Sequence, residues 1–346
     1  MMAADHTRIG LAGINERARR LLIPGLVGAP RAHLAAVCSR DERKARAVAA
    51  SLGPDVQAFS GVAAMAGSGA VDAVLLNTPV ETHLELCLAA LREGCAVICE
   101  KPLAAATDQA ITLQEAAQAA GRRTAVNFTY RSVAGFRMTE RLLAVPGIGR
   151  PMHAEFSLLQ GHNFLPGYPR RSALLDSGVH LLDTVSGLCE RAGMGHLAAL
   201  SAAPMLDRSA QGQRVDFGWA FTARTSGDVV VSGTLSRGAL GWRNGLRWSL
   251  YGEEGAIMVE LDAERTEVRL ARRDEGRPQG QWRPVPLTAD IQDDEARFPV
   301  FHLDRLVGAI RGEESFPGFA EAVTTHHLAD ALAASAAGGR WVTVRR

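Results

Sequence analysis

The sequence predicts an α/β domain with a parallel sheet over residues 1–127 and an α+β domain with a large, mostly antiparallel sheet over residues 128–346. Three observations support this fold class. The length of 346 residues fits about two domains. Strand-like and helix-like runs alternate as far as Asn127, which implies a parallel sheet covered by helices. Beyond Asn127, strand-like runs follow one another with few helices between them.

The first domain is predicted from short apolar runs and from helical spacing of leucine and alanine. The runs predict strands at Arg8–Gly13, Ala32–Cys38, Val71–Asn77, Ala96–Cys99 and Thr124–Asn127. The spacing predicts helices at Arg17–Leu26, Asp41–Leu52, Thr82–Arg92 and Thr107–Ala120. An acidic start supports the second of these helices, and Gly121 ends the fourth.

The second domain begins with a helix over Ala134–Leu143 that ends at Pro146-Gly147. Further strands are predicted at Met152–Leu159, Phe217–Arg224, Asp228–Leu235, Leu246–Tyr251, Ala256–Leu261, Glu267–Ala271 and Trp341–Val344. Helices are predicted at Ala173–Leu188, Pro299–Arg311 and Phe319–Ala337, and we expect the C-terminal helix to pack back on the first domain. Polar composition predicts loops at Asp274–Gln281 and Ala289–Glu295.

Composition argues against several classes of partner. Thirty-eight basic residues nearly cancel 37 acidic ones, so a nucleic acid or a membrane surface is not an expected partner. No run of roughly 18 apolar residues predicts a membrane span, and the N-terminus lacks an apolar signal core. Five cysteines without metal-motif spacing are expected to be core residues in a reducing cytoplasm, and no metal site is predicted.

Lysine is rare in this chain. Only Lys44 and Lys101 occur among the 38 basic residues. A lysine can change its protonation state where arginine cannot, so a surviving lysine is a candidate for chemistry. Lys44 lies in a charged, helical surface stretch, whereas Lys101 lies between Glu100 and Pro102. Lys101 is therefore the candidate functional lysine.

A glycine turn joins the first strand to the first helix. The segment Gly13-Ile14-Asn15-Glu16-Arg17-Ala18 lies where a Rossmann-type dinucleotide-binding domain has Gly-x-Gly-x-x-Gly/Ala. Gly13 and Ala18 fit the pattern, and Asn15 replaces its second glycine. An ordinary strand–helix turn is the alternative, and the alternation of elements around the segment favours the dinucleotide-binding turn.

Two further motifs are more specific. Asn77-Thr78-Pro79 precedes a helix that begins near His83, and Glu100-Lys101-Pro102 follows the strand at 96–99. Asp176-Ser177-Gly178-Val179-His180-Leu181-Leu182-Asp183 lies in the second domain. Together with Asn127-Phe128-Thr129-Tyr130-Arg131, these motifs resemble the glucose–fructose oxidoreductase / inositol dehydrogenase (Gfo/Idh/MocA) family. The resemblance implies a nicotinamide-dependent oxidoreductase that interconverts a secondary alcohol and a ketone on a sugar, cyclitol or related polyhydroxy substrate.

The resemblance also assigns residues. It implies that Lys101, Asp176 and His180 are catalytic and that the Lys101–Pro102 peptide bond is cis. The residues expected to bind the cofactor are Gly13, Asn15, Ala18, Ser39, Arg40, Thr78, Pro79, His83, Glu100 and Lys101. The residues expected to contact the substrate are Asn127, Tyr130, Arg131, Tyr168 and Asp183.

The spacing in the second-domain motif suits proton transfer. Asp176, His180 and Asp183 fall on one face of the predicted helix. Hydride transfer at a carbinol carbon requires proton transfer at its oxygen. Histidine, with an ordinary pKa of about 6.5, needs less tuning for this than lysine, at about 10.4. We therefore expect His180 to be the main acid/base, Lys101 to polarise the substrate oxygen and Asp176 to position the substrate.

The cofactor is expected to be NADP, with NAD as the alternative. Ser39-Arg40 follows the second strand, where an acidic residue would bind the free 2′-hydroxyl of NAD. A serine hydroxyl and a guanidinium can instead bind a 2′-phosphate. Asp41 is the opposing feature, and we expect it to begin the next helix and point away.

Alternatives and assembly complete the expectations. A non-catalytic member of the same family, favoured by Asn15, or a cofactor-assisted glycosidase would also fit the motifs. Val80, where the family has Asn, and the stretch Arg170–Ala173, where it often has glycines, leave the substrate open.

We expect a homo-oligomer, a dimer or tetramer, built through the second-domain sheet, because the strand at 228–235 is apolar on both faces.

Overall fold

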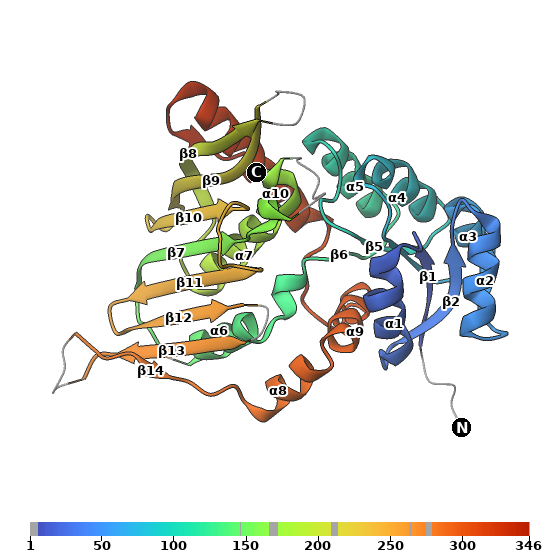
Figure 1. Cartoon of the computed structure of the whole chain (residues 1–346), viewed down its shortest axis with the longest axis horizontal. Coiled ribbons are helices and arrows are strands. Elements are labelled where there is room, and N and C mark those ends of the chain that lie inside the picture. Colours follow the sequence, from blue (N-terminus) through green and yellow to red (C-terminus); the bar gives the residue numbers. More distant parts are fainter. Residues whose placement is uncertain are drawn as a thin grey trace. The chain divides into compact units, whose positions relative to one another are not determined.

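The computed structural model describes residues 6–145, 147–165, 172–208, 214–262, 265–274 and 279–345, and it divides the chain into two compact units (Figure 1). The first unit comprises Met1–Ser132 and Asp294–Val323. The second unit comprises Val133–Asp293 and Thr324–Arg346. The first unit therefore includes residues 294–323, which the sequence analysis assigned to the second domain.

The first unit contains a six-stranded parallel sheet with the order β3-β2-β1-β4-β5-β6. Its strands are β1 (Thr7–Ala12), β2 (Ala32–Cys38), β3 (Gln57–Phe59), β4 (Ala73–Leu76), β5 (Ala96–Cys99) and β6 (Thr124–Val126). This is the Rossmann arrangement that the alternating elements predicted. The sequence analysis missed β3, which has only three residues and no apolar alternation.

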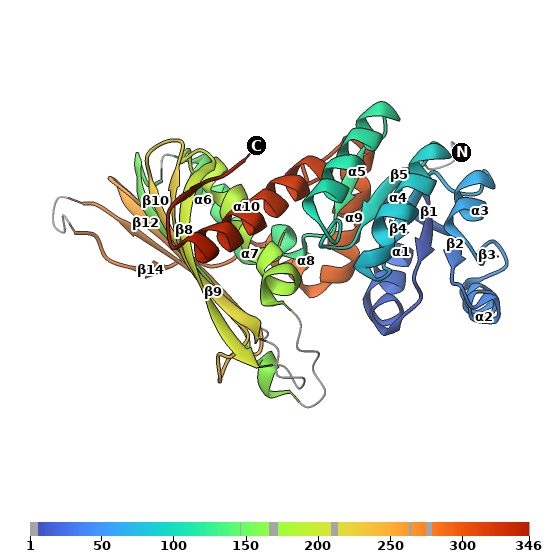
Figure 2. The same ribbon diagram turned by 90° about the horizontal axis from the view of Figure 1, so that it is seen from above.

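Helices cover both faces of this sheet. Those on one face are α1 (Ile23–Gly28), α2 (Glu42–Leu52) and α9 (Phe298–Arg311). Those on the other face are α3 (Val62–Gly67), α4 (His83–Arg92) and α5 (Thr107–Ala119). The helix α10 (Phe319–Gly338), long in Figure 2, begins in the first unit and continues in the second.

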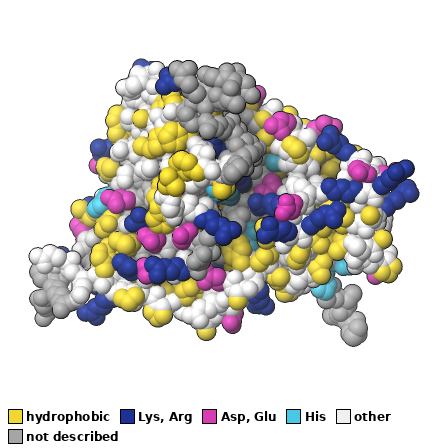
Figure 3. Space-filling model, viewed as in Figure 1, with side chains coloured by type: hydrophobic (Ala, Val, Ile, Leu, Met, Phe, Trp, Pro, Cys, Tyr) yellow, Lys and Arg dark blue, Asp and Glu magenta, His cyan; other side chains and the backbone are white. Residues whose placement is uncertain are grey.

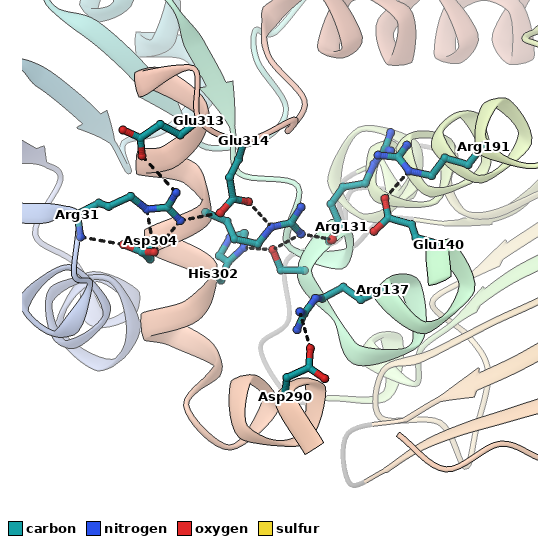
Figure 4. A network of polar contacts seen from close by, with 12 residues as sticks. Arg31, Arg131, Arg137, Glu140, Arg191, Asp290, His302, Asp304, Glu313 and Glu314 are labelled. Atoms are coloured by element: carbon teal, nitrogen blue, oxygen red, sulfur yellow. Dashed lines mark hydrogen bonds and ion pairs between the residues drawn. The ribbon is translucent and has the colours of Figure 1, made fainter. Parts of the chain in front are cut away.

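Helix α9 joins the first unit because its apolar face packs on α1. Leu303, Leu306 and Val307 are buried at helical spacing in the core of this unit. The two helices approach closely, since a Cβ on Gly28 would lie 2.6 Å from the side chain of Val300. An ion pair between Arg31 and Asp304, 2.6 Å long, closes the contact (Figure 4).

The second unit contains a nine-stranded sheet with the order β14-β13-β12-β11-β7-β10-β9-β8-β15. Its strands are β7 (Pro151–Leu159), β8 (Leu197–Arg208), β9 (Arg214–Thr225), β10 (Val230–Ser236), β11 (Gly245–Gly252), β12 (Gly255–Leu261), β13 (Thr266–Arg272), β14 (Arg283–Pro284) and β15 (Val342–Thr343). Only β10 and β7 pair in parallel, so the prediction of a mostly antiparallel sheet is confirmed.

Two helices, α6 (Ala134–Ala144) and α7 (Val179–Arg191), pack against this sheet. The buried Trp248 of β11 donates its indole N–H to the Thr139 hydroxyl of α6 at 3.0 Å. An ion pair between Arg191 and Glu140 joins the two helices (Figure 4). Among the described residues, no helix covers the sheet face opposite α6 and α7 (Figure 2), and this face is called the open face below.

The predicted loop at 289–295 is wrong, because Ala289–Ala296 forms helix α8. Five of its eight residues are polar, which is why composition indicated a loop. Ile291 is nevertheless fully buried, and Arg141 of α6 binds both Thr288 and Asp290 at its start. An acidic residue in the first turn also stabilises a helix. Tertiary contacts, rather than composition, therefore determine that this segment is helical.

Side-chain character varies over the surface. Figure 3 shows hydrophobic side chains gathered over the second unit, bordered by a band in which basic and acidic side chains alternate. Across the described parts of the chain, we find no helix with the length and hydropathy needed to cross a membrane.

Candidate active site

Five of the predicted site segments lie at the carboxyl edge of the first sheet. They follow β1 at Gly13, β2 at Ser39, β4 at Thr78, β5 at Glu100 and β6 at Asn127. The strand order reverses between β1 and β4. Ligands of open parallel sheets bind at such a reversal, outside the carboxyl ends of the strands.

Gly13 makes the turn after β1, and no other residue fits there. Its φ of 94° lies in the left-handed region. A Cβ at this position would lie 2.2 Å from the carbonyl oxygen of Asn77. The backbone of the turn is thus pressed against the backbone that follows β4.

Asn15, which replaces the second glycine of the pattern, has a defined structural role. Its side-chain oxygen accepts a hydrogen bond from the backbone N–H of the buried Ala18 at 3.0 Å. The same oxygen accepts from Asn77 Nδ2 at 2.9 Å, and Asn77 Nδ2 also donates to the Gly13 carbonyl at 2.9 Å. The sequence analysis did not assign Asn77 to the site, although its place at a strand end was the available signal.

The helix after this turn runs continuously over residues 16–28 and contains a π-helical segment at Ala18–Leu22 that leads into α1. The prediction of a helix over Arg17–Leu26 is therefore confirmed. In the second unit, Leu174–Gly178 is also π-helical and runs into α7. Short π-helical segments occur frequently at functional sites. The first begins at Ala18, the last residue of the glycine turn, and the second contains Asp176.

The segment after β2 contains Ser39 and Arg40 and leads into α2. Ser39 is half-buried and Arg40 is exposed. The Asp41 carboxylate caps α2 by accepting the backbone N–H of Lys44 at 3.1 Å. The expectation that Asp41 begins this helix is confirmed.

His83 joins the two motif loops of the first unit. Its Nδ1 lies 3.0 Å from the carbonyl oxygen of Pro102 and 3.2 Å from that of Leu103. Its Nε2 lies 3.0 Å from the carbonyl oxygen of Thr78. The buried ring therefore bridges the loop after β4 and the loop after β5.

Buried side chains surround Lys101 in the Glu-Lys-Pro segment. The Lys101–Pro102 bond is cis, as predicted. Cys99 and Leu103 are buried on either side of the half-buried Lys101. Glu100 is only 7% exposed, and its carboxylate binds Arg17 at 3.0 Å and accepts from Asn127 Nδ2 at 2.7 Å.

The predicted substrate residues of the first unit are buried. Asn127 is 1% exposed, and its amide contacts Glu100 and His302. Tyr130 and Arg131 are buried in the 3-10 turn Thr129–Ser132. Neither Arg17 nor His302 was identified from the sequence. His302 belongs to a helix whose pattern indicated only packing.

The Asp-x-Gly-x-His motif lies at the start of α7. Asp176 and His180 are half-buried, whereas Asp183 is 1% exposed. Asp176 forms an ion pair of 3.3 Å with Arg237, whose side chain is 1% exposed. Tyr168 lies outside the described residues.

Buried polar groups surround Asp176. Burial lowers the pKa of His162, an effect that the nearby Asp176 opposes. Arg237 also lies 3.5 Å from the carbonyl oxygen of Asp216, whose carboxylate binds Trp219 Nε1 at 2.8 Å. Arg237 was missed because a lone arginine after a strand carries no pattern.

The turn after β1 fits a dinucleotide, because Gly13 adds no side chain to the crowded turn and the strand reversal provides the crevice. A metal-dependent site has no such support. Among the described residues, no group of three or more His, Cys, Asp or Glu could hold a metal ion.

Comparisons with known proteins give a family. Residues 7–128 match the Gfo/Idh/MocA family, described as an oxidoreductase family with an NAD-binding Rossmann fold. Inositol 2-dehydrogenase 3 of Saccharopolyspora erythraea is 35% identical over 160 residues, which are 46% of this chain and 46% of that protein. The 3-reductase of dTDP-3,4-didehydro-2,6-dideoxy-alpha-D-glucose from Streptomyces violaceoruber is 30% identical over 278 residues, 75% of this chain and 76% of that protein.

A solved structure extends the likeness to the whole chain. The crystal structure of an NAD-binding oxidoreductase from Klebsiella pneumoniae superimposes with a TM-score of 0.84 at 25% identity. The alignment covers 99% of this chain and 100% of that one. Both units of the fold therefore have their counterparts in one known oxidoreductase.

Proposed function

This chain belongs to the Gfo/Idh/MocA family of oxidoreductases, and on that premise we propose that it interconverts a secondary alcohol and a ketone on a sugar or cyclitol with a nicotinamide cofactor. The related inositol dehydrogenase and deoxysugar reductase support this substrate class. The proposal depends on one observation, that this chain contains all three residues of the catalytic set. Lys101 follows the parallel strand β5, and Asp176 and His180 lie at the start of α7.

We propose that Gly13, Asn15, Ala18, Thr78, Pro79, His83 and Glu100 form the cofactor site with Lys101. The bound nicotinamide would supply the hydride acceptor or donor. Gly13 permits close approach of the backbone, since it has no side chain. His83 and Glu100 fix the two loops that follow β4 and β5 through their buried contacts.

The proposed proton chemistry assigns one task to each catalytic residue. In the oxidation direction, His180 accepts the hydroxyl proton as the carbinol carbon loses its hydride, and in reduction it returns the proton. Lys101 donates a hydrogen bond to the same oxygen and stabilises the charge that develops on it. The atoms balance, because one hydride and one proton leave the alcohol together.

Asp176 positions the substrate in this proposal, and Arg237 supports it. The 3.3 Å ion pair with a buried guanidinium favours the carboxylate form of Asp176. A carboxylate is an acceptor of hydroxyl hydrogen bonds, which suits a polyhydroxy substrate. We also propose that Asn127, Tyr130, Arg131 and Asp183, all of them buried, contact the substrate or support the residues that do.

The preferred cofactor in this proposal is NADP. The Asp41 carboxylate is engaged at the start of α2, and this supports Ser39 and Arg40 as the groups that meet the adenosine ribose. Their hydroxyl and guanidinium would bind a 2′-phosphate.

We also propose a cytoplasmic setting, which the five free and buried cysteines support.

The ratio of kcat/KM for NADP to that for NAD tests the cofactor assignment. Wild type is expected to prefer NADP, and Ser39→Asp is expected to shift the ratio toward NAD by about 10-fold or more, because a carboxylate repels the 2′-phosphate. Ser51→Asp is the matched control, because Ser51 is exposed in α2 roughly 15 Å along the helix from Asp41. A wild-type preference for NAD, or equal shifts in both variants, would reject the assignment.

A further inference from the structure

A buried chain of hydrogen bonds connects α9 to the Glu-Lys-Pro segment within the first unit. His302, on α9, lies 2.5 Å through Nε2 from Asn127 Oδ1 and 2.8 Å through Nδ1 from the Ser132 hydroxyl. Asn127 in turn donates to Glu100, the neighbour of Lys101. His302 and Asn127 are 175 positions apart in the sequence.

The direction of each hydrogen bond in this chain is determined. The Asn127 nitrogen must face the Glu100 carboxylate, because its oxygen there would meet another acceptor. Asn127 Oδ1 is then the acceptor for His302, so His302 Nε2 carries the hydrogen. His302 Nδ1 is left to accept from the Ser132 hydroxyl. The ring is neutral, since burial and the nearby Arg305 and Arg17 lower the pKa of His302 to about 3.

Two aromatic side chains contact the ring of His302. It stacks on Phe298 at 5.6 Å with an interplanar angle of 4°, and Phe316 lies 5.9 Å away. Arg305 covers Phe316 at 5.2 Å and donates to the Arg131 carbonyl at 2.7 Å, next to Ser132 (Figure 4). His302 therefore has little freedom to turn its N–H away from Asn127.

This chain of hydrogen bonds ends at the carboxylate of Glu100, which has few other contacts. Glu100 is 7% exposed and binds Asn127 and the half-exposed Arg17 through the same oxygen, Oε1. Without the N–H of His302, only the Thr129 hydroxyl, at 3.4 Å from Asn127 Oδ1, would favour this orientation of the Asn127 amide on the side away from Glu100. A turned amide would present oxygen to the carboxylate and displace it.

We infer that His302 is a positioning residue for the reaction: through Asn127 it fixes Glu100, and through Glu100 it fixes the backbone from which Lys101 reaches the substrate. The inference rests on the proposed role of Lys101. The inference gives His302, a residue of a C-terminal helix, an effect on catalysis. The sequence pattern of that helix indicates only packing.

Three variants test the inference by steady-state kinetics. His302→Leu removes both hydrogen bonds and is expected to lower kcat by about 10-fold or more with a smaller change in the KM of the cofactor, because a displaced catalytic group slows the chemical step. His302→Gln keeps a donor where Nε2 was and is expected to restore most of kcat. His326→Leu is the matched control, a buried histidine of α10 whose loss should leave kcat of the folded enzyme unchanged.

Chemical labelling provides a readout that does not depend on turnover. The chain has only two lysines, so an amine-directed acylating reagent modifies Lys101 and Lys44, and Lys44 is the internal standard. In His302→Leu the ratio of Lys101 to Lys44 labelling is expected to change by about threefold or more, since the reactivity of a lysine follows its surroundings. His302→Gln and His326→Leu should keep the wild-type ratio.

Lys101→Ala separates the two ways in which the account can fail. If Lys101→Ala loses activity while His302→Leu retains wild-type kcat and labelling ratio, the inference about His302 is overturned and the proposed function stands. If Lys101→Ala itself retains activity, the proposed role of the lysine is wrong.

Discussion

Lys101 and His180 are the residues on which the chemistry depends. We predict that Lys101→Ala and His180→Ala each lower turnover by about 100-fold or more, because each removes a group that acts on the reacting oxygen. Cofactor affinity, measured by titration of nicotinamide fluorescence, should change much less.

The controls for these two variants exist in the same chain. Lys44→Ala removes the only other lysine, and His33→Ala removes an exposed histidine of β2. Both should keep wild-type turnover. Near-full steady-state turnover on the true substrate in either Lys101→Ala or His180→Ala would show that the assigned role is wrong.

Individual residues were predictable where a motif fixes their chemistry. The cis bond at Lys101–Pro102 and the capping role of Asp41 followed from sequence and are confirmed. His302, Asn77 and Arg237 were not identified, because each acts through a contact with a group distant in sequence. No spacing rule within one helix or strand could have indicated such contacts.

At the scale of elements, the turn between β1 and the first helix depends on Gly13. We predict that Gly13→Ala lowers the free energy of unfolding by about 2 kcal/mol or more and weakens cofactor binding, because the added Cβ meets the Asn77 carbonyl in a left-handed backbone. Chemical denaturation and cofactor titration would measure the two effects.

Gly121→Ala is the control for the turn. Gly121 also has a positive φ, 60°, but a Cβ there would have nothing within 4 Å. Gly121→Ala should lower the free energy of unfolding by only about 1 kcal/mol, the cost of placing alanine in a left-handed conformation. It should leave cofactor binding unchanged. Equal losses in the two alanine variants would contradict the importance of the Asn77 contact.

Elements were predictable where local pattern and tertiary structure agree. Five of the six strands of the first sheet were predicted, because their sequences are mostly apolar. Strand β8 was missed, because its sequence is rich in alanine and contains Pro204. Proline is tolerated there since β15 covers only Ala199 and Leu200, which leaves the rest of β8 as an edge. The two π-helical segments likewise have no sequence signal.

At the scale of the whole molecule, the open face of the second sheet is the proposed interface of a homo-oligomer. A hollow of about 350 Å³ lies on this face and is lined in part by Ser157, Ser232 and Thr234. None of its lining residues belongs to the predicted site.

Light scattering at micromolar concentration tests this proposal. Wild type is expected to be a dimer or tetramer, and Ser232→Arg is expected to dissociate it, because a long charged side chain would enter the interface. Ser51→Arg, on exposed α2, should keep the wild-type mass. A monomeric wild type would contradict the proposed assembly.

The central claim is hydride transfer between a polyhydroxy substrate and a nicotinamide cofactor. The most direct measurement incubates the purified chain with inositols and sugars and each oxidised cofactor, and it follows both the reduced cofactor and the ketone product. The account predicts equal amounts of the two with at least one substrate, and loss of both in Lys101→Ala. Binding of cofactor and sugar without any reduction, or glycoside hydrolysis with no net change in the cofactor, would contradict it.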